Sequence, residues 1–203
     1  MKKSFTLLAI LVVAAGLFGQ ETPFKFSVET NLGILNTTLR NPPADANYER
    51  GWQLSAAVSR HLKGRHHLRL GLHFSNFQLD FSPPPSSSPI IFCFECDIFW
   101  FQIETRGVRW GHQFDLARSP GIRLSLINAL QTDYVAWVNF MDEPANVALS
   151  YAGEISADFK VFRKLWLKTG WIFQTALTRY ADFHDRSYFP IAYGMNLGMR
   201  RNF

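Results

Sequence analysis

The end of the chain is the stretch that most restricts what the protein can fold into. Residues 189–203, FPIAYGMNLGMRRNF, alternate between two kinds of side chain. A period of two is that of a β-strand with one apolar face and one polar face. Arg201 interrupts the apolar row near its end. The large apolar residues share one parity: Phe189, Ile191, Tyr193, Met195, Leu197, Met199 and Phe203.

The same alternation recurs along the rest of the chain, and it predicts seven earlier strands. Few of these segments place apolar residues at the spacing of a helix, so the strand interpretation is favoured over a helical one. In the third segment the apolar parity changes at Phe77, which predicts a β-bulge or the end of a membrane crossing. The predicted strands start and end near residues 24–35, 52–62, 66–81, 97–113, 122–137, 147–161 and 165–178.

The connections between these segments alternate in length. Long connectors rich in Asn, Pro and Ser occupy residues 36–50, 82–96, 139–146 and 181–188, and short turns lie between the other pairs. An even number of strands, with long connectors on one side and short turns on the other, is typical of membrane barrels. The sequence therefore predicts an all-β fold, an eight-stranded antiparallel up-and-down transmembrane β-barrel.

The first residues have the pattern of a secretory signal. Lys2 and Lys3 precede an apolar run from Leu7 to Leu17, and small residues follow it. This predicts a signal peptide over residues 1–20 and an outer-membrane barrel domain over residues 21–203. No Cys follows the apolar run, which argues against a lipoprotein, and no later stretch has the apolar length of a membrane helix.

Composition and charge exclude few functions. Hydrophobic residues make up 47% of the chain and aromatic residues 15%, and the aromatic share suits a barrel with aromatic girdles. Cleavage after residue 20 leaves 19 basic and 16 acidic residues, a net charge of +3. This charge is too small to indicate a nucleic-acid partner, and we expect none.

Alternation alone does not tell which face meets lipid, because a soluble lipocalin-like barrel would place its apolar face inside. The polar face here is rich in small residues such as Ser59, Gly71, Ser156 and Gly194, which a narrow interior accommodates. The apolar face carries bulky Phe, Leu, Trp and Tyr along its whole length. These features predict that the apolar face is outside, against lipid.

The polar parity then predicts a set of charged residues inside the barrel. An unpaired buried charge is costly, and eight strands leave room only for side chains. We therefore expect an interior plugged by salt bridges and not an open pore. The predicted lumenal charges are Glu29, Arg69, Glu104, Arg106, Arg123, Glu154, Asp158, Lys168 and Arg200.

The alternation, the connector asymmetry and the closing segment GMNLGMRRNF resemble the small eight-stranded outer-membrane barrels of the OmpA/OmpX type. The pattern is similar in particular to the outer-membrane β-barrel family of Bacteroidetes-like bacteria. The resemblance covers residues 21–203 and implies a Gram-negative outer membrane as location, with outer-membrane lipid and the barrel-assembly machinery as partners. It also implies that a C-terminal strand ending in Phe is an assembly signal, here Tyr193, Leu197, Met199 and Phe203.

No catalytic motif accompanies this resemblance, and we expect no cofactor, metal or catalytic residue. Cys93 and Cys96, in CFEC, are the only cysteines, and they predict a local disulfide in an exported loop or two unpaired thiols. His184 lies near acidic residues in the last connector, where solvation is the simpler interpretation. A cluster of His61, His66, His67 and His73 lies around the first turn without a fixed ligand geometry.

The function predicted from sequence is a structural or interaction role through the extracellular loops, with a possible envelope protein partner. Two alternatives remain open at this point. One is an outer-leaflet barrel enzyme acting on lipid or peptide, which requires His, Ser and acidic side chains to converge at the outer rim. The other is a porin-like channel for small solutes, which requires a continuous lumen.

Overall fold

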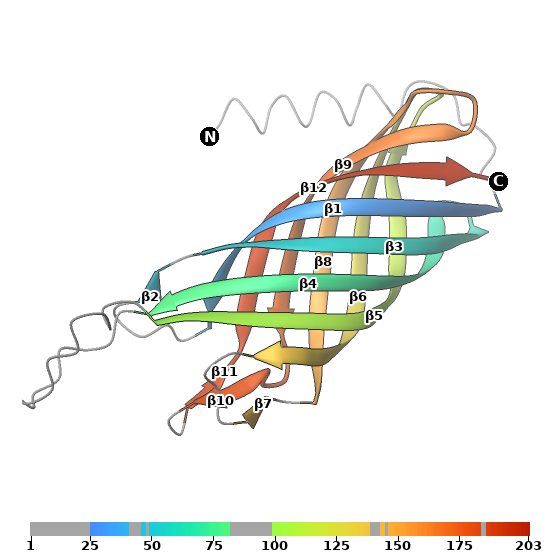
Figure 1. Cartoon of the computed structure of the whole chain (residues 1–203). Coiled ribbons are helices and arrows are strands. Elements are labelled where there is room, and N and C mark those ends of the chain that lie inside the picture. The colour runs from blue at the N-terminus through green and yellow to red at the C-terminus, as the bar shows by residue number, and fades with distance from the viewer. Residues whose placement is uncertain are drawn as a thin grey trace, which may run out of the picture.

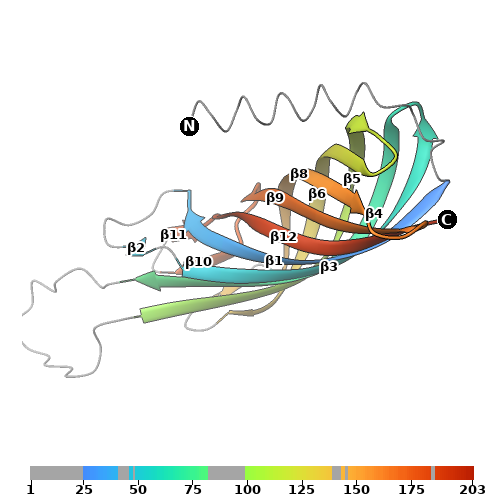
Figure 2. The ribbon, with the colours of Figure 1, turned by 90° about the horizontal axis from the view of Figure 1, so that it is seen from above.

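The computed structural model describes residues 25–40, 46–47, 49–81, 99–138, 143–144, 146–183 and 186–203. Eight long antiparallel strands form one closed sheet (Figures 1 and 2). The predicted signal peptide, Cys93, Cys96 and His184 lie outside the described residues. Within those residues, no helix is long and apolar enough to cross a membrane. The eight strands are β1 (Phe26–Leu39), β3 (Glu49–Lys63), β4 (His66–Phe81), β5 (Phe99–Arg118), β6 (Ile122–Val138), β8 (Val147–Lys160), β9 (Leu165–Ala176) and β12 (Pro190–Asn202).

The first and last long strands close the barrel. Strand β1 pairs with β12 from Ser27 opposite Asn202 to Leu39 opposite Pro190, and β4 pairs with β5 from His66 opposite Phe114 to Phe81 opposite Phe99. Each other long strand pairs with its neighbours in the chain. The predicted fold class is confirmed, and the C-terminal segment is the strand that completes the sheet.

The two ends of the barrel differ in their connections. Short turns join β3 to β4, β5 to β6 and β8 to β9, and we call this the turn end. In the first of these turns Gly64 has a φ of 61°, a left-handed conformation that glycine adopts without steric cost. Strand β1 begins and strand β12 ends there as well, so the first and last residues of the sheet lie at the turn end (Figure 1).

The opposite end, which we call the loop end, carries additional short strands. Strand β2 (Ala46–Asn47) extends the main sheet beside β4, while β10 (Ala181–Phe183), β11 (Arg186–Tyr188) and β7 (Glu143–Pro144) form a separate small sheet (Figure 1). The long connector predicted over residues 181–188 contains two of these short strands, since β10 and β11 pair with each other within it.

The parity change in β4 has a different cause from the predicted β-bulge. Strand β4 keeps one register with β3 from Asn76 to His67 and with β5 along its length. Phe77 therefore points into the barrel, where it is almost completely buried. An apolar residue stands on the inward parity because the loop end of the lumen is itself apolar.

Strand β5 reverses the predicted inward and outward faces. Ile103 and Thr105 are fully buried inside, whereas Arg106 and Trp110 are exposed on the outside. The predictions of Glu104 and Arg106 as lumenal charges are therefore wrong, since both belong to the outward parity of β5. Ile103 is apolar and points inward, so its residue type had wrongly indicated a lipid-facing position.

Candidate functional site

The centre of the charged lumen is the carboxylate of Glu29 on β1. Lys168 Nζ on β9 lies 3.0 Å from Glu29 Oε1, and Arg200 on β12 donates to Glu29 Oε2 at 2.6 Å. Arg69 on β4 forms a third salt bridge with the same carboxylate. Strands β1, β4, β9 and β12 thus each place one of these four charged side chains inside the turn-end half.

Two further carboxylates complete this cluster. Glu154 lies 2.7 Å from Lys168 and 3.7 Å from Arg69, and Asp158 pairs with Arg200. Both acids come from β8, on the inward parity. Because desolvated charges are tolerated when they are paired, alternating acids and bases allow a fully buried charged interior. We call Glu29, Arg69, Glu154, Asp158, Lys168 and Arg200 the central charge cluster.

A second network lies beside the central charge cluster at the turn end. Asp115 on β5 contacts His67 Nε2 at 3.0 Å, forms a salt bridge with Arg118 and accepts from Ser125 Oγ at 2.9 Å. Arg123, one of the predicted lumenal charges, has its Nε 3.9 Å from the same carboxylate. A register shift of β5 against β6 between Asp115 and Ala117 brings Arg118 back to the inward side.

A third network occupies the middle of the lumen around Asp133 of β6. His73 Nε2 lies 2.5 Å from Asp133 Oδ1, Ser150 Oγ donates to Oδ2 at 2.9 Å, and Tyr180 donates to Oδ2 as well. Gln131 donates to the same carboxylate at 2.8 Å. The five side chains are buried and hold one another in place.

The Asp133 network differs from a nucleophilic triad in its order of contacts. In such a triad the imidazole stands between the acid and the hydroxyl, so that it can take the hydroxyl proton. Here the carboxylate stands between them, since both His73 and Ser150 contact Asp133. The arrangement orders a buried core, and no hydrogen bond joins the Ser150 hydroxyl to an imidazole of the described residues.

Arg109 of β5 connects the Asp133 network to β3 by hydrogen bonds. Its guanidinium donates to Gln131 at 2.7 Å and to Gln53 of β3 at 3.2 Å. Gln53 in turn donates to Ser75 at 2.9 Å and to Gln174 at 3.3 Å. Side chains from β3, β4, β5, β6 and β9 thereby meet across the barrel, which leaves the middle of the lumen spanned by hydrogen bonds.

Above the polar networks, toward the loop end, the lumen is filled by apolar side chains. They lie on the inward parity of seven strands and on the segment after β9, and they pack into one buried cluster. The interior therefore changes from charged at the turn end to apolar at the loop end. The cluster contains Leu35, Phe77, Ile103, Val135, Ala148, Ile172, Ala176, Tyr180 and Ala192.

The structure places seven of the nine predicted lumenal charges inside: Glu29, Arg69, Arg123, Glu154, Asp158, Lys168 and Arg200. Sequence reasoning missed Arg109, Asp115 and Asp133, which are also inside. A signal for Arg109 and Asp115 exists in β5, whereas Asp133 lies on β6. From Thr105 to Asp115 the odd positions are small or polar, while Val108, Trp110 and Phe114 are apolar.

The predicted assembly signal lies on the outside of β12. Leu197, Met199 and Phe203 are each more than half exposed, and Tyr193 is partly exposed. Phe203 N donates to Phe26 O at 2.9 Å, so the last residue is still attached to the first strand of the sheet. Arg201 stacks over the Phe203 ring at 5.1 Å.

The predicted histidine cluster is divided between the two faces of the wall. His67 and His73 are buried inside, whereas His66 is outside and pairs with His112, Nδ1 to Nε2, at 2.9 Å. Among the residues that the structure describes, no group of three or more His, Cys, Asp or Glu side chains is placed to hold a metal ion.

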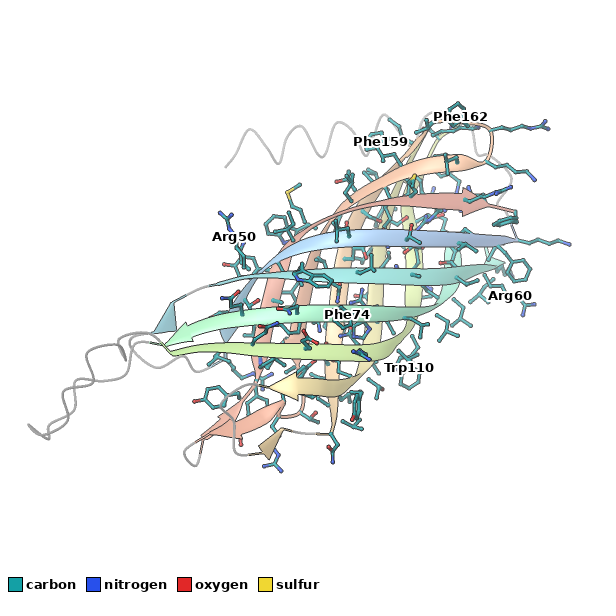
Figure 3. All side chains as sticks on the ribbon, viewed as in Figure 1. Arg50, Arg60, Phe74, Trp110, Phe159 and Phe162 are labelled. Atoms are coloured by element: carbon teal, nitrogen blue, oxygen red, sulfur yellow. The ribbon has the colours of Figure 1, made fainter. Side chains whose placement is uncertain are left out.

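The outer surface of the barrel is largely apolar. Apolar side chains such as Phe74, Trp110 and Phe159 cover it (Figure 3), and many of them are half exposed. On β3 the outward row from Trp52 to Leu62 is apolar except for Arg60, and at roughly 3.4 Å per residue and a tilt of about 40° it spans about 26 Å. A band of this height matches the hydrocarbon core that small barrels cross.

The chain is a transmembrane β-barrel. Its fold is that of small outer-membrane barrels. The crystal structure of Neisserial surface protein A is similar with a TM-score of 0.56 and 11% identity, over 90% of this chain and 100% of that one. OprG from Pseudomonas aeruginosa is similar with a TM-score of 0.55 and 8% identity, over 93% of this chain and 99% of that one.

No family model and no curated protein matches the sequence of this chain. The likeness to solved structures therefore concerns the fold. The more particular resemblance to barrels of Bacteroidetes-like bacteria stays a prediction.

Proposed function

We propose that the protein is an integral outer-membrane barrel whose closed body anchors loops that contact a partner at the cell surface. The observation that carries the proposal is the filled lumen. The central charge cluster and the Asp133 network cross the turn-end half and the middle, and the apolar cluster fills the loop-end half. A barrel of this kind transmits nothing through its interior, so its specific chemistry lies on its outer surface and its loops.

The location has support from the apolar outer band and from the fold shared with Neisserial surface protein A and OprG. In this proposal a signal peptide over residues 1–20 directs export. The turn end faces the periplasm and the loop end faces outward, as the short and long connectors of outer-membrane barrels do. The assembly machinery then recognises β12 through its outward row.

A planar-bilayer experiment tests the closed lumen. We expect the purified wild-type barrel to produce no stepwise current in bilayers that conduct after addition of a known porin. Glu29→Ser combined with Lys168→Ser and Arg200→Ser shortens three central side chains and is expected to produce small conductance steps. Heat-modifiable gel mobility confirms that each barrel is folded, and steps from the wild type would overturn the proposed closure.

Cross-linking in native membranes tests the interaction role. We expect a specific partner to be captured by the wild-type barrel and lost when residues 82–96 are replaced by a Gly-Ser connector. The triple serine variant is the matched control, since it changes the lumen and leaves the loops unaltered. Equal capture by the loop variant would contradict recognition through this loop.

A further inference from the structure

An open hollow of about 560 Å³ lies in the outer wall of the barrel. Its walls come from four adjacent strands, β1, β3, β4 and β5, on the side of the barrel that Figure 3 presents around Phe74. Such a volume is within the range of about 300–1,000 Å³ that small-molecule sites occupy. The lining residues are Thr30, Leu54, Ser55, Ala56, Leu72, His73, Phe74, Arg106, Gly107 and Val108.

The hollow exists because small side chains interrupt the bulky outer surface. Ala56 on β3 stands opposite Thr30 of β1 and Leu72 of β4. Larger outward side chains surround it, with Leu54 on the loop-end side and Val58 on the turn-end side, each about half exposed. Ala56 is thus the floor of a depression within the apolar band.

Arg106 stands at the edge of the apolar band. On β5 the outward residues change from Trp110 and Val108 to Arg106 and then Glu104. On β4 they change from Leu72 and Phe74 to Asn76 and Gln78. Phe74, Arg106 and Tyr134 of β6 lie at the same level in the register. Aromatic residues mark this level as the one where headgroups meet the hydrocarbon core.

The charge of Arg106 is not neutralised by the described part of the chain. Its guanidinium stacks over the Phe74 ring at 5.6 Å, and no salt bridge or hydrogen bond joins it to a described residue. The nearest outward acid along β5, Glu104, accepts instead from Asn76 and Gln102, each at 3.4 Å. An arginine at this depth favours an anion with several acceptor oxygens, and phosphate matches its planar donors.

We propose that the hollow binds one molecule of a lipid A type glycolipid, with a phosphate on Arg106 and an acyl chain lying over Ala56. Lipid tails are as apolar as the barrel surface, so burial alone would not select one lipid from the bilayer. The contact of Arg106 with phosphate favours an anionic headgroup over a zwitterionic one, and the hollow adds packing contacts along the chain. On the loop-end side of Arg106, the outward residues Asn76, Gln78 and Gln102 carry amide side chains. In the proposed complex the sugar hydroxyls lie at this level.

This inference rests on the membrane location in the proposed function and not on the closed lumen. Titration of the detergent-purified barrel, followed by native mass spectrometry, measures it. We expect one bound bisphosphorylated lipid A at a concentration roughly tenfold below that needed for phosphatidylcholine, as one charge-assisted contact provides. Phosphatidylglycerol is the second probe, because it carries a phosphate without the sugars.

Two variants separate the two halves of the site. Arg106→Gln is expected to weaken lipid A binding about tenfold, and lipid A lacking its phosphates should bind the wild type equally weakly. Ala56→Leu fills the hollow, keeps the charge and is expected to reduce binding as well. Arg60→Gln is the matched control, because Arg60 is also an exposed arginine stacked over a phenylalanine, Phe26, at 6.0 Å.

Several outcomes would overturn the proposal. If the wild type and Arg106→Gln bind lipid A equally well, Arg106 does not contact the phosphate. If Ala56→Leu also binds as well as the wild type, the acyl chain does not lie in the hollow. If phosphatidylglycerol and lipid A bind the wild type with equal affinity, the site is not specific for a glycolipid. Each variant is compared at matched heat-modifiable mobility, so a misfolded barrel is not read as lost binding. A conducting wild type would contradict the closed lumen and leave this result unaffected.

Discussion

Arg200 and Arg201 are neighbours in the chain and lie on opposite sides of the barrel wall. Arg200 is fully buried, with its guanidinium on Glu29 and Asp158, whereas Arg201 is exposed over the Phe203 ring. A strand with a period of two gives the same residue type two environments at adjacent positions. The central charge cluster therefore depends on which of the two arginines points inward.

This difference predicts unequal effects of one substitution. Arg200→Met leaves Glu29 and Asp158 with fewer cations and is expected to destabilise the barrel by about 3–5 kcal/mol, as loss of one partner of a buried pair does. Arg201→Met is expected to change stability by less than about 0.5 kcal/mol. Urea unfolding in lipid vesicles, followed by tryptophan fluorescence, measures both, and equal losses would contradict the assignment.

Glu29 is expected to be coupled to Lys168. Glu29→Gln leaves three basic side chains around a neutral amide, and Lys168→Met leaves two acids without their shared cation. Each single change is expected to be strongly destabilising, while the double variant loses less than the sum because it removes charges of both signs. A double-mutant cycle in urea measures the coupling.

Glu104→Gln is the control for Glu29→Gln, since Glu104 is an acid on the outward face. We expect its effect on the free energy of unfolding to be within about 0.5 kcal/mol. Additive losses in the cycle would show that Glu29 and Lys168 act independently, against the network described.

Gly107 is expected to tolerate no side chain. A Cβ there would collide with the Thr132 carbonyl and lie 2.6 Å from His73 Cε1 and 2.9 Å from Asp133 Oδ1. Gly107→Ala is thus predicted to cost about 1–3 kcal/mol, the range for overpacking. Gly121→Ala is the matched control, because no atom lies within 4 Å of the position that its Cβ would take. Thermal unfolding of the two variants should differ clearly, and equal midpoints would contradict the tight packing around Gly107.

Phe203 is predicted to act in assembly. Phe203→Ala is expected to reduce the amount of folded barrel in cells, while its unassisted refolding into vesicles changes much less. Phe162→Ala, an exposed phenylalanine in the turn between β8 and β9, serves as control. The heat-modifiable fraction measures both conditions, and a loss of equal size in cells and in vesicles would indicate a stability effect instead.

Alternation allowed most of the fold to be predicted from the sequence, because side chains of one parity lie on the same face of a strand. It failed on β5, where Ile103 is inside and Arg106 outside. In this part of β5 the polarity of a residue does not indicate whether its side chain points inward or outward. The loop end of the lumen is apolar, and an arginine can lie on the outer face at the edge of the membrane. The same cause explains why Phe77 suggested a bulge.

The sequence by itself determined the eight strands, the barrel and seven charged residues of its interior, because a period of two records which face each residue joins. Only the tertiary structure decided which charges meet. Glu29 contacts Lys168 and Arg200, which are far away in the chain, through the closure of β1 on β12. The hollow beside Arg106 also required it, because four strands contribute its walls and register across them is not encoded in any one strand.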